Sequence, residues 1–132
     1  MTAVEKYLFT PLYYPESTRA VLRWWEARRP FFNICVGAAG LLSLATISLI
    51  AHLLPLGGPF PVSWRVVILY AVMANLAYLL GPAADLALRG VLGDRAPAVG
   101  PVLFRYGLAF SIGLSLLPIP LAVLGWLISL IG

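Results

Sequence analysis

The sequence predicts an all-α integral membrane protein, with an N-terminal interfacial amphipathic helix followed by three transmembrane helices. The first observation is composition, because 61% of the 132 residues are hydrophobic and 11% are charged. Soluble domains contain about 45–50% apolar and about 25% charged residues. The second is that the apolar residues form three long stretches, each able to cover a hydrocarbon core of about 30 Å. With one cysteine, Cys35, the chain is neither a disulfide scaffold nor, at this hydropathy, disordered.

Residues 1–30 are predicted to form an interfacial segment. Within it, residues 16–29 follow Pro15, and Ser17 or Thr18 suits the cap of a short amphipathic helix. Tryptophans and tyrosines favour the headgroup layer, and long arginine side chains snorkel toward it. An alternative is that this helix packs on the soluble surface of a partner protein. The predicted interfacial anchors are Tyr13, Tyr14, Trp24, Trp25, Arg28 and Arg29.

Residues 31–132 are predicted to form the transmembrane domain, with spans at about 31–54, 63–88 and 102–131. The first stretch contains no Lys, Arg, Asp or Glu. In the second, Gly81-Pro82 predicts a kink, because proline removes a backbone donor and clashes one turn back. The third carries Pro118 and Pro120 near its middle, which predicts one long helix kinked there; the alternative is a broken or re-entrant helix.

The basic residues predict the orientation of the chain. Five of them precede the first span, three lie between Arg89 and Arg105, and the intervening turn carries Arg65 alone. In a three-span topology the two basic regions fall on one side of the membrane. Because Lys and Arg favour the cytoplasmic side, we expect the N-terminus inside and the C-terminus outside.

Small residues at four-residue spacing predict where the helices touch. Burial drives little association within lipid, so close approach depends on small side chains. The first span offers Cys35, Ala39 and Ser43, the second offers Ala77, Gly81 and Asp85, and the third offers Gly107, Ser111 and Ser115. The predicted packing residues are therefore Ala39, Ser43, Gly81, Gly107, Ser111 and Ser115. Their expected neighbours are other helices of this chain, other membrane chains or further copies.

Asp85 is the sharpest candidate for chemistry. An acidic side chain inside a membrane helix costs about 2.5–3.5 kcal/mol at the helix centre and is a functional hypothesis by default. Arg89 lies four residues later on the same helical face, where the two side chains can pair. Two interpretations stay open: a structural pair with Arg89 or Arg105, and a site for a proton, an ion or a partner.

Three further polar residues lie in apolar stretches. Asn75 and Tyr78 are one helical turn apart, and buried amides usually bond a neighbouring helix; a substrate or quinone contact is the alternative. His52 is the single histidine, so a bis-histidine haem would need a second chain. Haem, pigment or quinone binding near His52 is therefore expected only with a partner.

The functional hypotheses follow from these residues. No Walker loop, His-Glu-x-x-His or Gly-x-Ser-x-Gly motif occurs, and we predict neither an enzyme nor a metal or nucleic-acid site. The first hypothesis is a non-catalytic membrane subunit or scaffold, in contact with lipid, that packs in a larger complex or a homo-oligomer. The alternatives are a small oligomeric transporter or channel using Asp85, and a membrane anchor for a cofactor at His52.

The opening of the chain also carries a resemblance. Tyr13-Tyr14-Pro15 is followed by Trp24-Trp25-Glu26 with Arg28 and Arg29, and then by Asn33 entering the first span. This pattern resembles the opening of small uncharacterised bacterial integral membrane proteins. It covers about the first quarter of the chain and implies a bacterial inner-membrane location with no assigned activity.

Overall fold

A computed structural model describes residues 1–12, 17–54 and 63–132. Within these residues every regular element is a helix. The elements are α1 (Ala3–Phe9), α2 (Thr18–Leu53), α3 (Trp64–Tyr78), α4 (Leu80–Leu92), the short 3₁₀ helix η1 (Gly93–Arg95), α5 (Gly100–Leu116) and α6 (Pro118–Ile131). Three helical stretches are long and apolar enough to cross a membrane: Thr18–Leu53, Trp64–Arg95 and Gly100–Ile131. The all-α class and the three membrane-length helices are thus confirmed.

The first long helix corrects one prediction. The predicted helix over residues 16–29 and the predicted first span are a single continuous helix, α2, which runs through Pro30. Its 36 residues extend about 54 Å. Pro30 removes one backbone hydrogen bond. The helix nevertheless has buried residues on both sides of Pro30, with Trp25 before it and Phe32 after it. The Ser17 hydroxyl caps the start by accepting from the backbone N–H of Ala20.

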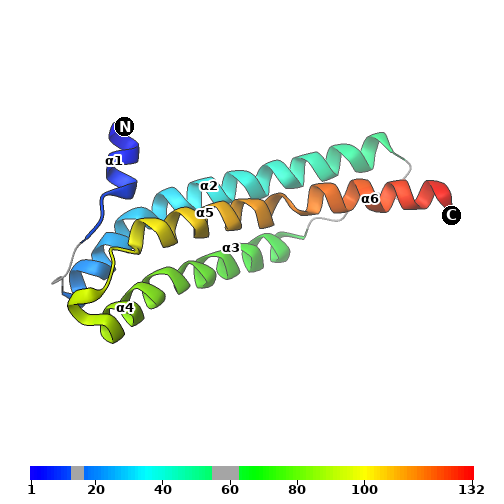
Figure 1. Cartoon of the computed structure of the whole chain (residues 1–132). Coiled ribbons are helices and arrows are strands. Elements are labelled where there is room, and N and C mark those ends of the chain that lie inside the picture. Colours follow the sequence, from blue (N-terminus) through cyan, green and yellow to red (C-terminus); the bar gives the residue numbers. More distant parts are fainter. Residues whose placement is uncertain (13–16, 55–62) are drawn as a thin grey trace.

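The other two spans are each interrupted once. The second changes from α3 to α4 at Leu79, one turn before the predicted Gly81-Pro82 position. Pro82 has no N–H to donate to the carbonyl four residues earlier, so the regular bonding fails at that preceding turn. The third changes from α5 to α6 at Leu117, whose φ of −55° and ψ of −35° remain helical. Figure 1 shows α5 leading directly into α6.

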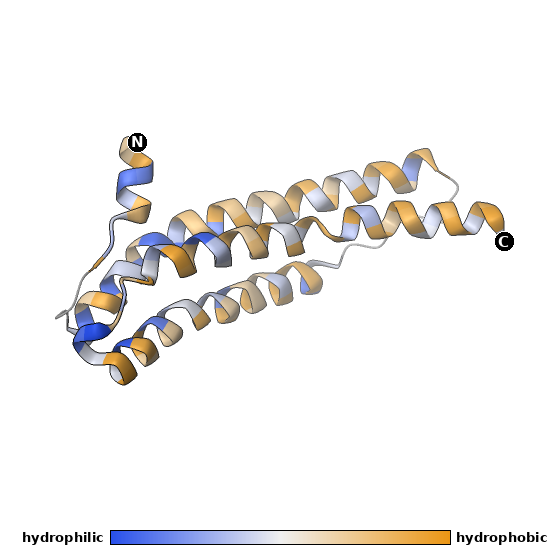
Figure 2. Cartoon of the chain, in the orientation of Figure 1, coloured by the Kyte–Doolittle hydropathy of each residue, from blue (hydrophilic) through white to orange (hydrophobic). Residues whose placement is uncertain are grey.

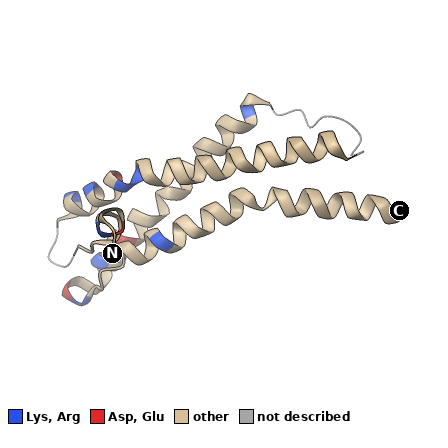
Figure 3. Cartoon of the chain, turned by 90° about the horizontal axis from the view of Figure 1, so that it is seen from above, with Lys and Arg blue, Asp and Glu red and all other residues tan. Residues whose placement is uncertain are grey.

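The helices alternate in direction and gather around α2. Helix α2, the α3–α4 pair and the α5–α6 pair run along the same axis, and the N- and C-termini lie at opposite ends (Figure 1). Helix α2 touches α3, α4, α5 and α6. The short α1, which the sequence did not predict, lies across the bundle and is seen end-on in Figure 3.

Charge divides the molecule into two ends. The charged end consists of α1, the first turns of α2 and α5, the last turns of α4, and η1; the far end holds the end of α2, the start of α3, and α6. Polar residues concentrate at the charged end (Figure 2), and the blue Lys and Arg positions gather there (Figure 3). By element, eight of the nine Lys and Arg residues belong to this end. Arg65 is the exception. The structure therefore brings together the two basic regions expected on one side of the membrane.

The buried core follows the same division. Its members are Leu8, Val21, Trp24, Trp25, Phe32, Val36, Tyr78 and Phe104. They come from α1, residues 21–36 of α2, the last residue of α3 and the first turns of α5, so they lie toward the charged end. Helix α6, by contrast, has no buried residue.

Candidate functional site

Asp85 of α4 forms the centre of a buried polar cluster at the charged end. Its Oδ1 accepts a hydrogen bond from Arg89 Nε at 2.8 Å, and its Oδ2 accepts one from Trp25 Nε1 at 3.0 Å. Asp85 is 2% exposed. The predicted pair with Arg89 therefore forms, and both carboxylate oxygens have a partner.

Two glycines allow the Trp25 ring to reach this carboxylate. A Cβ at Gly81, one turn before Asp85, would lie 2.5 Å from the Trp25 ring. A Cβ at Gly100 would lie 3.1 Å from Asp85 Oδ2. At Gly81 a side chain would collide with the indole, and at Gly100 it would press tightly on the Asp85 carboxylate. Gly81, a predicted packing residue, thus packs against a helix of its own chain.

Arg28 fastens α1 to α2. It is 5% exposed, and its Nε donates to the carbonyl oxygen of Leu8 at 2.8 Å. Its Nη2 donates to the carbonyl oxygen of Tyr7, and its Nη1 to that of Trp24 at 2.7 Å. The last carbonyls of a helix lack partners within it and carry partial negative charge. Arg28 therefore caps the C-terminus of α1, and its role as an interfacial anchor stays a prediction.

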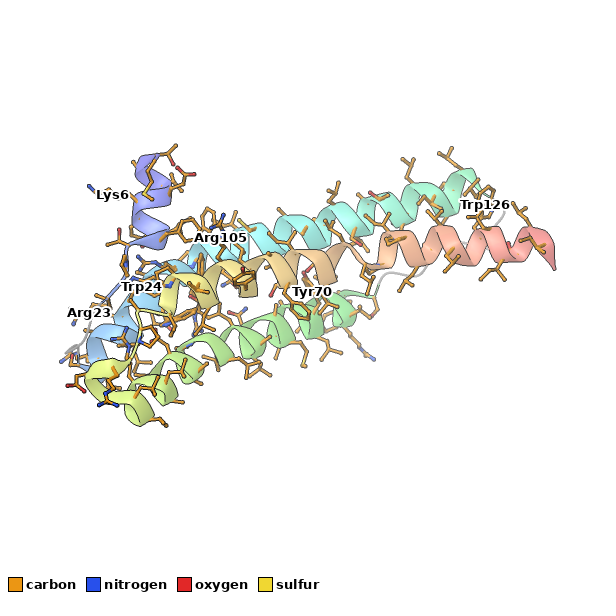
Figure 4. All side chains as sticks on the ribbon, viewed as in Figure 1. Lys6, Arg23, Trp24, Tyr70, Arg105 and Trp126 are labelled. Carbon is orange, nitrogen blue, oxygen red and sulfur yellow. The ribbon has the colours of Figure 1, made fainter. Side chains whose placement is uncertain are left out.

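Both tryptophans also point into the chain (Figure 4 labels Trp24). Trp24 Nε1 donates to the carbonyl oxygen of Thr10 at 2.8 Å, and the Trp24 ring lies 3.6 Å from the Arg28 guanidinium carbon. The two indoles meet edge to face at 5.2 Å, and each makes a similar contact with Phe104. The predicted interfacial anchors Trp24 and Trp25 are thus core residues, and each indole N–H finds an acceptor within the chain.

The segment before α2 is held by hydrogen bonds at its backbone and at the Tyr7 side chain. Arg89 Nη2 donates to the carbonyl oxygen of Leu12 at 2.8 Å, so the buried ion pair extends to this segment. The Tyr7 hydroxyl donates to the carbonyl oxygen of Ala27 at 2.6 Å. Tyr13 and Tyr14, the other predicted anchors, lie outside the described residues. Because carbonyl acceptors are present at every residue, no pattern in the sequence indicates these contacts.

Near the start of α1, Glu5 forms a capping box with Thr2. Hydrogen bonds from the backbone N–H and the hydroxyl of Thr2 lower the pKa of the Glu5 carboxyl. The box fixes the first turn of α1, and Arg28 fixes the last.

An apolar groove separates α3 and α4 from α5. Its volume is about 610 Å³, and Trp25, Phe32 and Val36 of α2 contribute to its lining. Its walls carry small residues: Ala74, Ala77, Gly81 and Ala84 on one side, and Gly107 and Ser111 on the other. All three predicted packing residues on α5, Gly107, Ser111 and Ser115, therefore line a space that this chain leaves open.

Tyr70 of α3, labelled in Figure 4, ties three helices together within this groove. Its hydroxyl donates to the carbonyl oxygen of Val36 at 3.0 Å and is hydrogen-bonded to Ser115 Oγ. Ser115 Oγ also lies 2.7 Å from the carbonyl oxygen of Ser111. The Tyr70 ring lies against Gly40, where a Cβ would be 3.0 Å away. Sequence reasoning missed Tyr70, since a lone tyrosine in an apolar stretch carries no spacing signal.

The polar residues Asn75 and Tyr78 have different surroundings. The Tyr78 hydroxyl donates to the carbonyl oxygen of Trp25 at 2.6 Å and is buried. Asn75 Nδ2 donates to the carbonyl oxygen of Ala71 at 3.0 Å, within α3 itself rather than to a neighbouring helix as expected. The two side chains do not form one site.

The remaining predicted residues lie along α2. Ala39 and Ser43 are buried in helix contacts, as their small size predicted. His52 is exposed in the last turn, and its cofactor role stays a prediction. Among the described residues, no three His, Cys, Asp or Glu side chains gather closely enough to hold a metal ion.

Comparisons with protein families, with curated proteins and with solved structures found no match. Asp85, Arg89 and Arg28 are committed to bonds within the chain, whereas the groove between α3–α4 and α5 is open.

Proposed function

We propose that this chain is a non-catalytic integral membrane subunit, which packs against other membrane chains or further copies of itself. The observation that carries the proposal is the open groove beside α5, walled by small residues such as Ala77 and Gly107. Small side chains let helix backbones approach closely, which is how membrane helices associate. A transmembrane helix of the partner is the proposed occupant, seated along the mouth of the groove.

The outer surface supports this proposal. The apolar windows of the three spans are only 17%, 11% and 6% buried within the chain. Among the described residues, no Asp, Glu, His, Lys or Arg side chain lines the groove. This lining is complementary to an apolar partner surface or to lipid. In the described part of the chain it offers no charged group to bind a hydrophilic substrate.

The placement in the membrane is part of the proposal. The excess of Lys and Arg at the charged end favours a cytoplasmic position for that end. With the resemblance described above, this supports a bacterial inner membrane with the N-terminus inside. We propose that α1, lying across the bundle, takes the interfacial position and that the third span bends at Pro118–Pro120.

Mild-detergent purification of the tagged chain from its own membranes tests the proposal. We expect a particle larger than the single chain, or co-purifying chains, and loss of that association in Gly107→Leu, which fills the groove. Gly113→Leu is the matched control, because both glycines lie on α5 with no neighbour within 4 Å of a Cβ, and Gly113 is not part of the groove lining.

Unchanged association of Gly107→Leu would contradict the groove as the interface. A visible absorption band that disappears in His52→Ala would favour the cofactor anchor instead. Ion flux in liposomes that Asp85→Asn abolishes would favour the transporter.

A further inference from the structure

A second hollow lies on the opposite side of α3. It has a volume of about 390 Å³ and is lined by Arg29 of α2 and by α3 residues. The α3 residues are Ala71, Val72, Asn75, Leu76 and Leu79. At 100° per residue they share one helical face, whereas the α3 residues of the groove share the other.

Arg29 brings unused hydrogen-bond donors to this hollow. Its Nη2 donates to Glu26 Oε1 at 2.6 Å. Its Nε is buried and has no hydrogen-bond partner among the described residues. A guanidinium has five N–H donors in a fixed fork that matches the oxygens of a phosphate. The side chain lines the hollow and is 28% exposed, while its Nε is buried, so a ligand in the hollow would meet the guanidinium through its Nη groups.

Polarity changes along the length of the hollow. Arg29 lies 5.2 Å from the Tyr78 ring, near the end of α3 that faces the charged end of the molecule. Val72 and Ala71 lie one to two turns further toward the middle of the span. Asn75 lies between them and donates one of its two amide N–H groups to Ala71. A cation at one end of an apolar hollow complements a phosphate group joined to hydrocarbon chains.

We propose that this hollow binds an anionic glycerophospholipid, with its phosphodiester at Arg29 and an acyl chain along Val72 and Leu76. The net positive charge of the protein, +4, favours an anionic lipid. The inference goes beyond the proposed function, because it does not depend on association with other chains.

Lipid binding to the purified chain tests this site. The protein is exchanged into phosphatidylcholine nanodiscs and titrated with phosphatidylglycerol, and retained lipid is counted by native mass spectrometry. We expect one phosphatidylglycerol retained per chain. Loss of charge-assisted hydrogen bonds in Arg29→Gln should weaken retention roughly tenfold or more. Arg23→Gln is the control, since Arg23 is an exposed arginine of the same end of α2 outside the hollow, and should change it less than about twofold.

A second variant keeps the charge and removes the space. Val72→Phe fills the hollow at an exposed position, so the chain should fold, and it should also weaken phosphatidylglycerol retention. Equal retention in Arg29→Gln and Arg23→Gln would overturn the proposal, as would equal retention of phosphatidylcholine. Full displacement by inorganic phosphate alone would show an anion site that does not recognise lipid, and would overturn it too.

Discussion

The charged end and the far end of this molecule are built in different ways. At the charged end, polar side chains are buried and reach across helices: Asp85 joins α4 to α2, and Arg28 joins α2 to α1. At the far end, α6 has no buried residue, and its apolar side chains face outward. The charged end is held by hydrogen bonds within the chain. The far end exposes its apolar side chains.

This difference follows from the physics of the bilayer. Lipid tails are as apolar as leucine, so apolar faces gain little by meeting each other within the membrane. Polar groups without a partner there are costly, which makes their hydrogen bonds specific restraints. We infer that the charged end determines the arrangement of the helices, while the middle and far regions of the helices provide surface for lipid or partners.

The largest effect is expected from breaking the buried ion pair. In Arg89→Leu, the Asp85 carboxylate keeps its burial and loses its cation, which should lower the free energy of unfolding by about 3–5 kcal/mol. Unfolding by sodium dodecyl sulfate in mixed micelles would measure this. The double variant Arg89→Leu with Asp85→Asn should recover part of the loss. A loss below 1 kcal/mol in the single variant would contradict the central role of the pair.

A somewhat smaller effect is expected from releasing α1. Arg28→Gln replaces the charge-assisted hydrogen bonds to the carbonyls of Tyr7 and Leu8 with at most a neutral one, which should cost about 1.5–3 kcal/mol in total. Hydrogen exchange should increase in residues 1–12, with little change in α5. Arg23→Gln is the control, because Arg23 is an exposed residue of the same helix. It should leave the exchange of residues 1–12 unchanged. Equal protection of residues 1–12 in Arg28→Gln would show that α1 is held by other contacts.

Filling the space at Gly81 is the third test. Gly81→Leu places a side chain against the Trp25 ring, and overpacking of this kind costs about 1–3 kcal/mol. Gly90→Leu is matched to it, because Gly90 lies on the same helix with no atom near the added Cβ. The two variants should therefore differ clearly in thermal stability and in Trp fluorescence. Similar melting temperatures would mean that the Trp25 ring moves aside without cost.

The smallest effect is expected halfway along the bundle. Tyr70→Phe removes the hydroxyl that bonds Val36 and Ser115, and hydrogen bonds between membrane helices average about 0.6 kcal/mol. Tyr106→Phe is the control, since Tyr106 is largely exposed. A loss in Tyr70→Phe as large as that of Arg89→Leu would contradict the contrast between the two ends.

Much of the fold was predictable from the sequence, because membrane spans depend on local composition. The three apolar stretches, the proline interruptions and the clustering of basic residues all appear in the printed sequence. The pairing of Asp85 with Arg89 was also predictable, since a four-residue spacing places both side chains on one helical face. These features depend on neighbours along the chain.

The tertiary structure alone decided which polar side chains became buried. Trp24, Trp25 and Arg28 have the composition of membrane anchors, yet their partners are Asp85, 60 residues away along the chain for Trp25, and backbone carbonyls before α2. A periodic pattern records which face of a helix is apolar and carries no information about the acceptor opposite it. The same reason explains Tyr70, the continuity of α2 through Pro30, and the groove: each is a product of how three helices meet in space.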